Sequence, residues 1–427
     1  MDFICSRSTL SGEVEIPASK SHTIRAVSIG ALAEGESRIE RPLQSADAWA
    51  AVEAYRMLGA VVTTTDTAWT VTGAGGRLQT PENVIDVGNS GTTVNIALGS
   101  CALLRGGMAV LTGDAQIVRR PSGPLAQSLN DLGASARSTR GNGCPPFVVE
   151  GRLRGGETSL DAAASSQYLT SLLINTPLAD GESRIRVSRL HERPYVEMTL
   201  DWIRRQGIQL EHDDALTEFR VPGEQAYKPV ERPIPGDFST ATFFLCAGAM
   251  GRNDITCLGL DYQDTQGDRA VVEYVRQMGA EVAVEDDRIR VRPKQLQGCE
   301  IDLNATPDAL PMMAVLGCFA QGETRLVNVP QARFKETDRL AVMHRELERL
   351  GAHIEELEDG LVIRQSDLRG AEVDGHGDHR VIMALAIAGT MAEGKTRVRG
   401  ADAVEVTFPE FANAMTLLGA EIWSVYE

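Results

Sequence analysis

A glycine that follows a helix-like stretch recurs six times along the chain, and this repeat restricts the fold more than any other feature. The segments read MLGAVV, DLGASA, RQGIQL, QMGAEV, RLGAHI and LLGAEI, with glycines at Gly59, Gly133, Gly207, Gly279, Gly351 and Gly419. Neighbouring glycines are 74, 74, 72, 72 and 68 residues apart. Glycine adopts the left-handed conformation that ends many helices without steric cost. Six nearly even copies therefore indicate one structural unit repeated six times.

The order of segments within each period also repeats. A helix is predicted to begin at each of six polar segments, SKSHTIR, NSGTTVN, SSQYLTS, DFSTATF, TPDALPM and GDHRVIM. A strand, a second helix that ends at the repeated glycine, and antiparallel strands are expected to follow. This order predicts a βαβαββ unit of about 70 residues, which is large enough to bury a two-layer core of its own.

Six such units predict an α/β (α+β) fold with two domains of three units each. The length of 427 residues also favours two or three domains. The Pro-rich stretch VERPIPGD at 230–237 falls between the third and the fourth unit, and a short strand near 12–17 supplies a second crossing. We therefore expect one discontinuous domain from residues 1–15 and 236–427, a second domain from residues 16–235, and hinges near 12–17 and 230–237.

The overall charge limits the classes of partner. The chain has 42 Lys and Arg residues against 59 Asp and Glu residues, a formal net charge of -17. Such an acidic protein is a poor candidate for binding nucleic acid or a membrane surface. Its seven cysteines are scattered, and no cysteine lies near His376 and His379 to complete a metal-ligand set. We therefore expect a cytoplasmic protein that uses no metal.

The predicted helix starts indicate a site for anions. They are rich in Ser, Thr, Asp and Asn, which are expected to cap the first-turn N–H groups. A helix N-terminus carries about half a positive charge and attracts anions. Basic residues near these starts or in neighbouring segments are Lys20, Arg25, Arg119, Arg120, Arg333, Lys335, Arg339 and Arg380. In an acidic chain this placement predicts a positive pocket for small anionic substrates.

Nine segments together resemble the enolpyruvyl transferase family, in the family's order and along the whole chain. They are IPASKSHTIRA, GNSGTT, RRPSGPL, SSQYLTSLL, PGDFSTATFF, PDALPMMAV, FKETDRLAVM, DHRVIMALAIA and TFPEF. The resemblance implies two inside-out α/β barrels of three repeats each, arranged as a clamshell. It implies transfer of the enolpyruvyl group of phosphoenolpyruvate to the 5-hydroxyl of shikimate-3-phosphate, with phosphate released through a tetrahedral intermediate. It implies no cofactor and these two small molecules as partners, and we expect a monomer.

The resemblance also assigns site residues position by position. Those implied to bind phosphoenolpyruvate are Lys20, Gly91, Arg120, Gln167, Arg339 and Arg380. Those implied to bind shikimate-3-phosphate are Ser21, Arg25, Ser165, Ser166, Gln167, Tyr195, Asp308, Gln331 and Lys335. The catalytic residues would be Lys20, Asp308, Lys335, Glu336 and His379. Asp308 would accept the hydroxyl proton, and which group protonates the methylene carbon stays open.

Four positions depart from the family pattern. Asn95 and Val406 stand where basic residues are usual, Gln331 replaces an asparagine, and Glu192 replaces a serine that helps to hold the acceptor's phosphate. The loss of two cations predicts weaker binding of phosphoenolpyruvate and of glyphosate, which imitates it. A carboxylate beside a phosphate is repulsive by about 1 kcal/mol or more. Either Arg193 intervenes, Glu192 turns away, or the acceptor is a different compound.

Other interpretations therefore stay open. One is a related enolpyruvyl transferase with another hydroxyl acceptor, and a second is a noncatalytic anion-binding protein on the same scaffold. Taken singly, Ser165, Ser166 and Asp308 are also typical of helix caps, and His379 of an interior histidine. The retention of Asp308 and Glu336 favours an enzyme, because binding alone needs no acid–base groups.

Overall fold

The computed structural model describes residues 1–426, and within this range the chain forms six four-stranded sheets together with helices. The fold is mixed α/β, as the sequence predicts. The chain divides into two compact units, one made of Met1–Pro17 with Pro235–Glu427 and the other of Ala18–Ile234. Among the described residues no helix is both long and apolar enough to cross a membrane.

The unit Ala18–Ile234 contains three sheets, with strand orders β14-β3-β5-β4, β6-β7-β9-β8 and β10-β11-β13-β12. Its helices are α1 (Lys20–Leu32), α2 (Ala46–Met57), α3 (Gly91–Cys101), α4 (Gly123–Asp131), α5 (Gln167–Asn175) and α6 (Arg193–Arg205). Its strands are β3 (Glu34–Glu40), β4 (Val61–Thr64), β5 (Ala68–Ala74), β6 (Ile85–Asp86), β7 (Met108–Thr112), β8 (Ala134–Ser138), β9 (Phe147–Gly151), β10 (Gly156–Ala162), β11 (Ser183–Leu190), β12 (Glu211–His212), β13 (Glu218–Val221) and β14 (Glu231–Pro233).

The other unit contains the sheets β16-β17-β15-β2, β18-β19-β21-β20 and β22-β23-β1-β24. Its helices are α7 (Phe238–Gly248), α8 (Val271–Gln277), α9 (Leu310–Gly317), α10 (Arg339–Arg349), α11 (His379–Met391) and α12 (Phe411–Leu417). Its strands are β1 (Asp2–Ser6), β2 (Ser11–Glu15), β15 (Asp254–Leu258), β16 (Glu281–Glu285), β17 (Arg288–Arg292), β18 (Glu300–Asp302), β19 (Glu323–Val327), β20 (His353–Glu356), β21 (Leu361–Arg364), β22 (Glu372–Asp374), β23 (Lys395–Arg399) and β24 (Glu421–Val425).

All six sheets have the same topology, in which one parallel pair is followed by two antiparallel pairs. Three sheets complete this pattern with a strand from a distant part of the sequence. Strand β14 lies parallel to β3, and β2 lies parallel to β15. Strand β1 lies between β23 and β24 and pairs antiparallel with both. The short strand that the sequence predicts near residues 12–17 is therefore β2.

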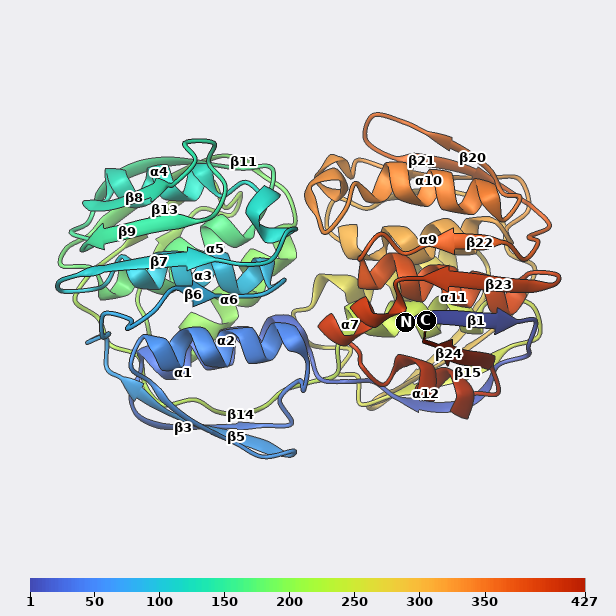
Figure 1. The fold of residues 1–427 in the computed structure, drawn as a ribbon, viewed down its shortest axis with the longest axis horizontal. Coiled ribbons are helices and arrows are strands. Elements are labelled where there is room, and N and C mark those ends of the chain that lie inside the picture. Colours follow the sequence, from blue (N-terminus) through green and yellow to red (C-terminus); the bar gives the residue numbers. More distant parts are fainter. Residues whose placement is uncertain (427) are drawn as a thin grey trace. The chain divides into compact units, whose positions relative to one another are not determined.

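The first helix of each repeat is buried on nearly every side. All residues of α7 and α9 are buried, and so are all but one residue of α11. A helix that is apolar all round belongs in a protein core, and these three helices contact one another within their unit. Helices α1, α3 and α5 form the corresponding core of the other unit. The second helices, such as α6 and α10, bury only one face. Figure 1 shows the helices and strands of each unit, coloured along the sequence.

The repeated glycines end the second helices as predicted. All six have a positive φ, between 77° and 102°. A side chain at these positions would be strained because a Cβ atom disfavours the left-handed region. The predicted helix boundary is therefore confirmed in every repeat.

The predicted capping of the first helices is confirmed at four of the six and wrong at α1 and α9. The side chains of Ser90, Asp237 and Asp378 accept hydrogen bonds from first-turn N–H groups of α3, α7 and α11. At α5, Ser165 Oγ accepts from the N–H of Gln167, while the Ser166 hydroxyl donates to the carboxylate of Glu192, which directly precedes α6. Ser19 before α1 makes no capping bond, and α9 follows Ala309, which has no side-chain cap.

Candidate active site

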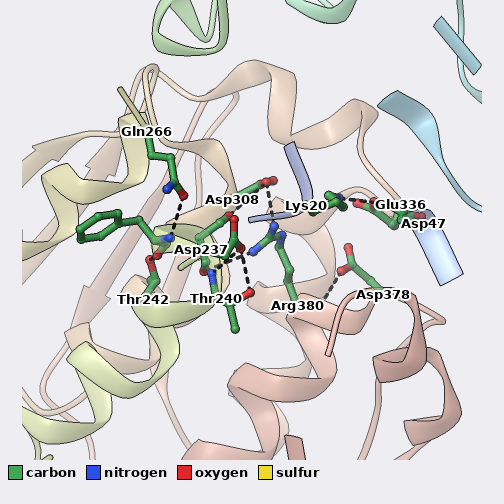
Figure 2. Close-up of polar contacts among 12 residues, drawn as sticks. Lys20, Asp47, Asp237, Thr240, Thr242, Gln266, Asp308, Glu336, Asp378 and Arg380 are labelled. Atoms are coloured by element: carbon green, nitrogen blue, oxygen red, sulfur yellow. Dashed lines mark hydrogen bonds and ion pairs between the residues drawn. The ribbon is translucent and has the colours of Figure 1, made fainter. Parts of the chain in front are cut away.

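Arg339 lies at the centre of a buried group of charges, and we name its five members the Arg339 cluster: Arg339, Arg380, Asp308, Glu336 and Asp378. The Arg339 guanidinium donates to Asp308 Oδ1 at 2.7 Å and to Glu336 Oε2 at 2.6 Å. Its Nε donates to Asp378 Oδ2 at 2.8 Å. Arg380 Nη2 lies 3.0 Å from the second oxygen of Asp308. Figure 2 shows Asp308 pointing toward Arg380.

The side chains of the cluster are almost completely buried from solvent, and this burial strengthens their ion pairs. The side chain of Arg339 is 1% exposed and that of Asp378 is fully buried. Burial alone lowers the pKa of Arg339, but the combined attraction of Asp378, Glu336 and Asp308 outweighs it and holds the pKa well above its usual value. Arg339 is therefore permanently charged.

The starts of the three core helices meet at this cluster. Asp308 lies in the 3-10 turn Pro307–Ala309 that leads into α9, and Asp378 and Arg380 open α11. Arg380 Nη1 donates to the backbone oxygen of Ser239 in the first turn of α7 at 3.4 Å. Arg339 is the first residue of α10. Helix starts from different repeats therefore converge within this unit.

The cluster differs from the predicted positive pocket in its charge balance. Its two arginines face three carboxylates, so their charges are already matched within the protein. The reason is physical, because a buried guanidinium without counter-charge would cost several kcal/mol. An anionic ligand that binds Arg339 or Arg380 therefore competes with carboxylates of the protein.

The remaining predicted residues of this unit lie on short 3-10 helices or at the start of α11. Lys335 directly precedes Glu336 at the end of the 3-10 helix Pro330–Phe334 and is partly buried. Gln331 is 1% exposed, and its amide donates to the backbone oxygen of Asn304 at 2.9 Å. His379 is the first residue of α11 and is buried. Val406 ends the 3-10 helix Ala401–Val406.

In the other unit, Lys20 opens α1 and pairs with a carboxylate that the sequence analysis did not identify. Lys20 Nζ lies 3.1 Å from Asp47 Oδ2, and the two side chains are only 14% and 4% exposed (Figure 2). Asp47 lies in the first turn of α2. This pair fixes the position of the Lys20 ammonium group near the start of the helix.

Gly91 lies against Arg120, and this contact explains the glycine. A Cβ atom added at Gly91 would overlap Arg120 Nη1, so a larger residue here would push the guanidinium away from the start of α3. Asn95 donates to the backbone oxygen of Gly91 at 2.8 Å and accepts from Ser122 Oγ at 2.9 Å. Asn95 thus ties the loop that carries Arg120 to α3, in a position where the family pattern has a cation.

The start of α5 brings together Ser165, Ser166, Gln167 and Glu192. Ser165 Oγ accepts from the backbone N–H of Gln167 at 3.2 Å, and Gln167 Nε2 lies 3.4 Å from Ser166 Oγ. Ser166 Oγ donates to Glu192 Oε2 at 2.7 Å. The carboxylate of Glu192 therefore does not turn away from the residues that are predicted to hold a phosphate.

Arg25 is fully buried and connects three helices. Its guanidinium donates to Thr199 Oγ1 at 2.9 Å, to the backbone oxygen of Tyr195 at 3.1 Å and to that of Ser21 at 2.9 Å. A fourth bond at 3.3 Å reaches Thr170. Burial lowers the pKa of Arg25 to about 10, so it keeps its charge at neutral pH. These contacts hold α1, α5 and α6 together beside Tyr195, which is 8% exposed.

Asp378 and Asp47 are the two charged residues that the site prediction missed. Asp378 stands in the segment GDHRVIM, directly before the predicted residues His379 and Arg380, but its position there is typical of a helix cap. Asp47 has no signal of its own in the sequence. Among the described residues no group of three or more His, Cys, Asp or Glu side chains is placed to hold a metal ion.

Comparisons with known proteins agree on one family. The model of the family described as EPSP synthase (3-phosphoshikimate 1-carboxyvinyltransferase) matches residues 4–415. A 3-phosphoshikimate 1-carboxyvinyltransferase of Acetivibrio thermocellus is 52% identical over 97% of this chain and 98% of its own. The enzyme of that name from Ruminiclostridium cellulolyticum is 49% identical with the same coverage. The structure of EPSP synthase from Acinetobacter baumannii matches with a TM-score of 0.83 at 25% identity, over 99% of this chain and 100% of the other.

Proposed function

Because this chain belongs to the EPSP synthase family, it transfers the enolpyruvyl group of phosphoenolpyruvate to shikimate-3-phosphate, and we propose that the residues described above bind and activate these two substrates. The observation that supports this assignment of residues most directly is the Arg339 cluster. Two guanidinium groups and a carboxylate that could act as a base share hydrogen bonds there. Phosphoenolpyruvate carries a carboxylate and a phosphate, and guanidinium forks match both groups.

In the proposed addition step, Asp308 accepts the proton of the 5-hydroxyl while the hydroxyl oxygen forms a bond to C2 of phosphoenolpyruvate. The π electrons of the C2–C3 bond take up a proton at C3 from Glu336 or Lys335, with assistance from His379. The product is a tetrahedral intermediate in which C3 is a methyl group. In the elimination step the methyl group returns a proton, the C2–O bond to phosphate breaks, and phosphate leaves.

The hydrogen bonds of Asp308 connect substrate binding with this chemistry. Without substrate, both of its oxygens accept from arginines, and such bonds favour the ionised carboxylate and make it a weak base. We propose that the anionic groups of phosphoenolpyruvate bind Arg339 and Arg380 in place of Asp308. Asp308 then loses these donors, and its affinity for the hydroxyl proton rises.

We assign the remaining site residues to ligands as follows. Lys20, Gly91, Arg120 and Gln167 complete the phosphoenolpyruvate site, in which Lys20 stabilises the charge of the intermediate. The residues that bind shikimate-3-phosphate are Ser21, Arg25, Ser165, Ser166, Gln167, Tyr195, Asp308, Gln331 and Lys335. The buried bonds of Arg25 support a positioning role in this set, since they connect α1 with α5 and α6.

We also propose the finer architecture of the family for this chain. The predicted domains, 1–15 with 236–427 and 16–235, would each form an inside-out α/β barrel, with buried helices surrounded by sheets. As a clamshell, a monomer would close when both ligands are present, because the predicted site residues come from both parts of the chain. Small-angle scattering that is unchanged by the two ligands together would contradict closure.

A phosphate-release assay tests the proposed residues. The purified protein is given phosphoenolpyruvate and shikimate-3-phosphate, and Asp308→Asn is compared with wild type. The loss of a general base is expected to lower kcat by about 10²–10⁴-fold. Wild-type activity in Asp308→Asn would contradict the role of Asp308, and Glu410→Gln serves as a control because Glu410 is exposed.

A further inference from the structure

A buried carboxylate occupies the N-terminal end of α5. Glu192 is 1% exposed, and its Oε2 accepts from Ser166 Oγ at 2.7 Å and from the Ser166 backbone N–H at 3.4 Å. Ser166 is itself fully buried and directly precedes the helix. A helix start and a serine hydroxyl are the donors that bind anionic oxygen in proteins. The carboxylate of Glu192 is therefore bound in the manner of an anionic ligand.

The backbone of Glu192 has an unfavourable conformation. Its φ of 57° and ψ of 39° lie in the left-handed region, which is unfavourable for a residue with a side chain. Glu192 is the N-cap of α6, but its side chain makes no capping hydrogen bond to that helix. The side chain accepts hydrogen bonds at the start of α5 instead of capping α6.

Gln167 supplies one further donor next to this carboxylate. Its Nε2 faces the Ser166 hydroxyl at 3.4 Å, while its Oε1 is buried without a hydrogen-bond partner among the described residues and, as an acceptor, does not bind an anion. Arg193 follows Glu192 but is directed elsewhere, since its Nε lies 2.8 Å from Glu197 Oε1 and its Nη2 donates to the backbone oxygen of Asp214 at 2.6 Å.

We propose that Glu192 is an internal competitor for the phosphate of the acceptor. Its carboxylate holds Ser166 when no acceptor is bound, and it must leave before a phosphate can take the same donors. This inference rests on the proposed function, because it takes shikimate-3-phosphate as the acceptor and the start of α5 as its phosphate site. Glu192 then determines the affinity for the phosphorylated acceptor without contacting the reacting atoms.

Two substitutions separate charge from backbone effects. Glu192→Gln keeps the size of the side chain and removes its charge. Glu192→Asn is neutral, too short to reach Ser166 in the same way, and asparagine tolerates the left-handed conformation. We expect the KM for shikimate-3-phosphate to fall by about tenfold in both variants, because a charge-assisted hydrogen bond no longer competes. Neither kcat nor the KM for phosphoenolpyruvate is expected to change.

Two controls make the test specific. Glu197→Gln removes a carboxylate from the same helix, where it is 46% exposed, and it should leave the KM for shikimate-3-phosphate unchanged. Unphosphorylated shikimate, tested as a competitive inhibitor, should bind the wild type and the Glu192 variants equally, since it does not need the position of the carboxylate. Thermal denaturation establishes that each variant is folded, and either folded variant is sufficient for the test.

The possible outcomes are distinct. A lower KM for shikimate-3-phosphate with constant inhibition by shikimate supports the proposal. An unchanged KM in a folded variant would mean that the carboxylate is only structural, and a higher KM would mean that it binds the acceptor; both results overturn the proposal. A wild-type protein that releases no phosphate from the two substrates would instead contradict the proposed function. In that case, calorimetric titration of wild type and variants with shikimate-3-phosphate still measures the competition.

Discussion

Asp378→Asn tests how the Arg339 cluster is held together. The carboxylate of Asp378 is fully buried and accepts four hydrogen bonds. Two come from Arg339, at 2.8 and 3.3 Å, one from Thr337 Oγ1 at 3.1 Å, and one from the backbone N–H of Arg380 at 2.9 Å. An asparagine offers one oxygen and one NH2 group. Whichever way the amide is turned, its NH2 group faces an N–H donor of Arg339, together with either the Thr337 hydroxyl or the Arg380 backbone N–H.

The expected loss follows from these contacts. On either side, at least two donors would lose a charged acceptor in a buried site, and each such bond contributes about 1.5–3 kcal/mol. The sum agrees with the roughly 3–5 kcal/mol that is typical when one partner of a buried ion pair is removed. For a unit of this size, 1 kcal/mol corresponds to about 2–4 °C in Tm, so we expect a decrease of roughly 6–20 °C.

Differential scanning calorimetry measures this decrease, and the KM for phosphoenolpyruvate measures the displacement of Arg339. We expect this KM to rise more than about tenfold, because a bidentate guanidinium contact depends on its orientation. Asp402→Asn makes the same change of charge in the same unit, where the side chain is 67% exposed, and it should shift Tm by less than about 2 °C. A shift that small in Asp378→Asn would refute the reasoning about the cluster.

Three further changes test other parts of the structure. Gly91→Ala should raise the KM for phosphoenolpyruvate, measured by phosphate release, because the new methyl group displaces Arg120; an unchanged KM would count against the contact. Asn253→Ala removes bonds of 2.8 Å to two backbone groups and should cost about 1–3 kcal/mol in urea unfolding. Burial raises the pKa of Glu346, but hydrogen bonds and nearby arginines together hold the pKa below its ordinary value of 4.5. The ionised carboxylate therefore stabilises the folded protein above pH 4.5, and this contribution is lost as the pH falls through the lower pKa of the folded state. Glu346→Gln should therefore reduce stability near neutral pH and lessen the decline below about pH 4.5; a parallel curve of Tm against pH would contradict this.

The fold could be predicted where the signal is local. Gly59 and its five counterparts have a left-handed backbone because a helix must end there, and this requirement is visible in the sequence. The exchange of strands is not local. Phe3 pairs with Val398 on one side and with Ser424 on the other, and no pattern within either segment specifies such a partner. Only the need for a missing strand, inferred from the repeat, pointed to the segment near residues 12–17.

The site could be predicted as a set of residues but not as a network. The resemblance identified Arg339 and Arg380 because each stands in a recognisable segment. Which carboxylates neutralise these two arginines depends on how three repeats pack. The ion pair between Asp378 and Arg339 could therefore be identified only from the structure. The sequence left open whether Glu192 turns away or stays. Its backbone is left-handed, with a φ of 57° and a ψ of 39°, a conformation for which glutamate gives no signal in the sequence.

The placement of β1 has a consequence for biosynthesis. The unit Ala18–Ile234 is continuous, so it can fold while the ribosome is still extending the chain, as is general for N-terminal domains. The first seventeen residues, by contrast, belong to the unit completed last, and β1 finds its neighbours only when β23 and β24 have been made. Until β24 has been synthesised, β1 lacks one of its two neighbours, although the unit Ala18–Ile234 can already be folded. The sheet β22-β23-β1-β24 can thus be completed only after β24 has been synthesised.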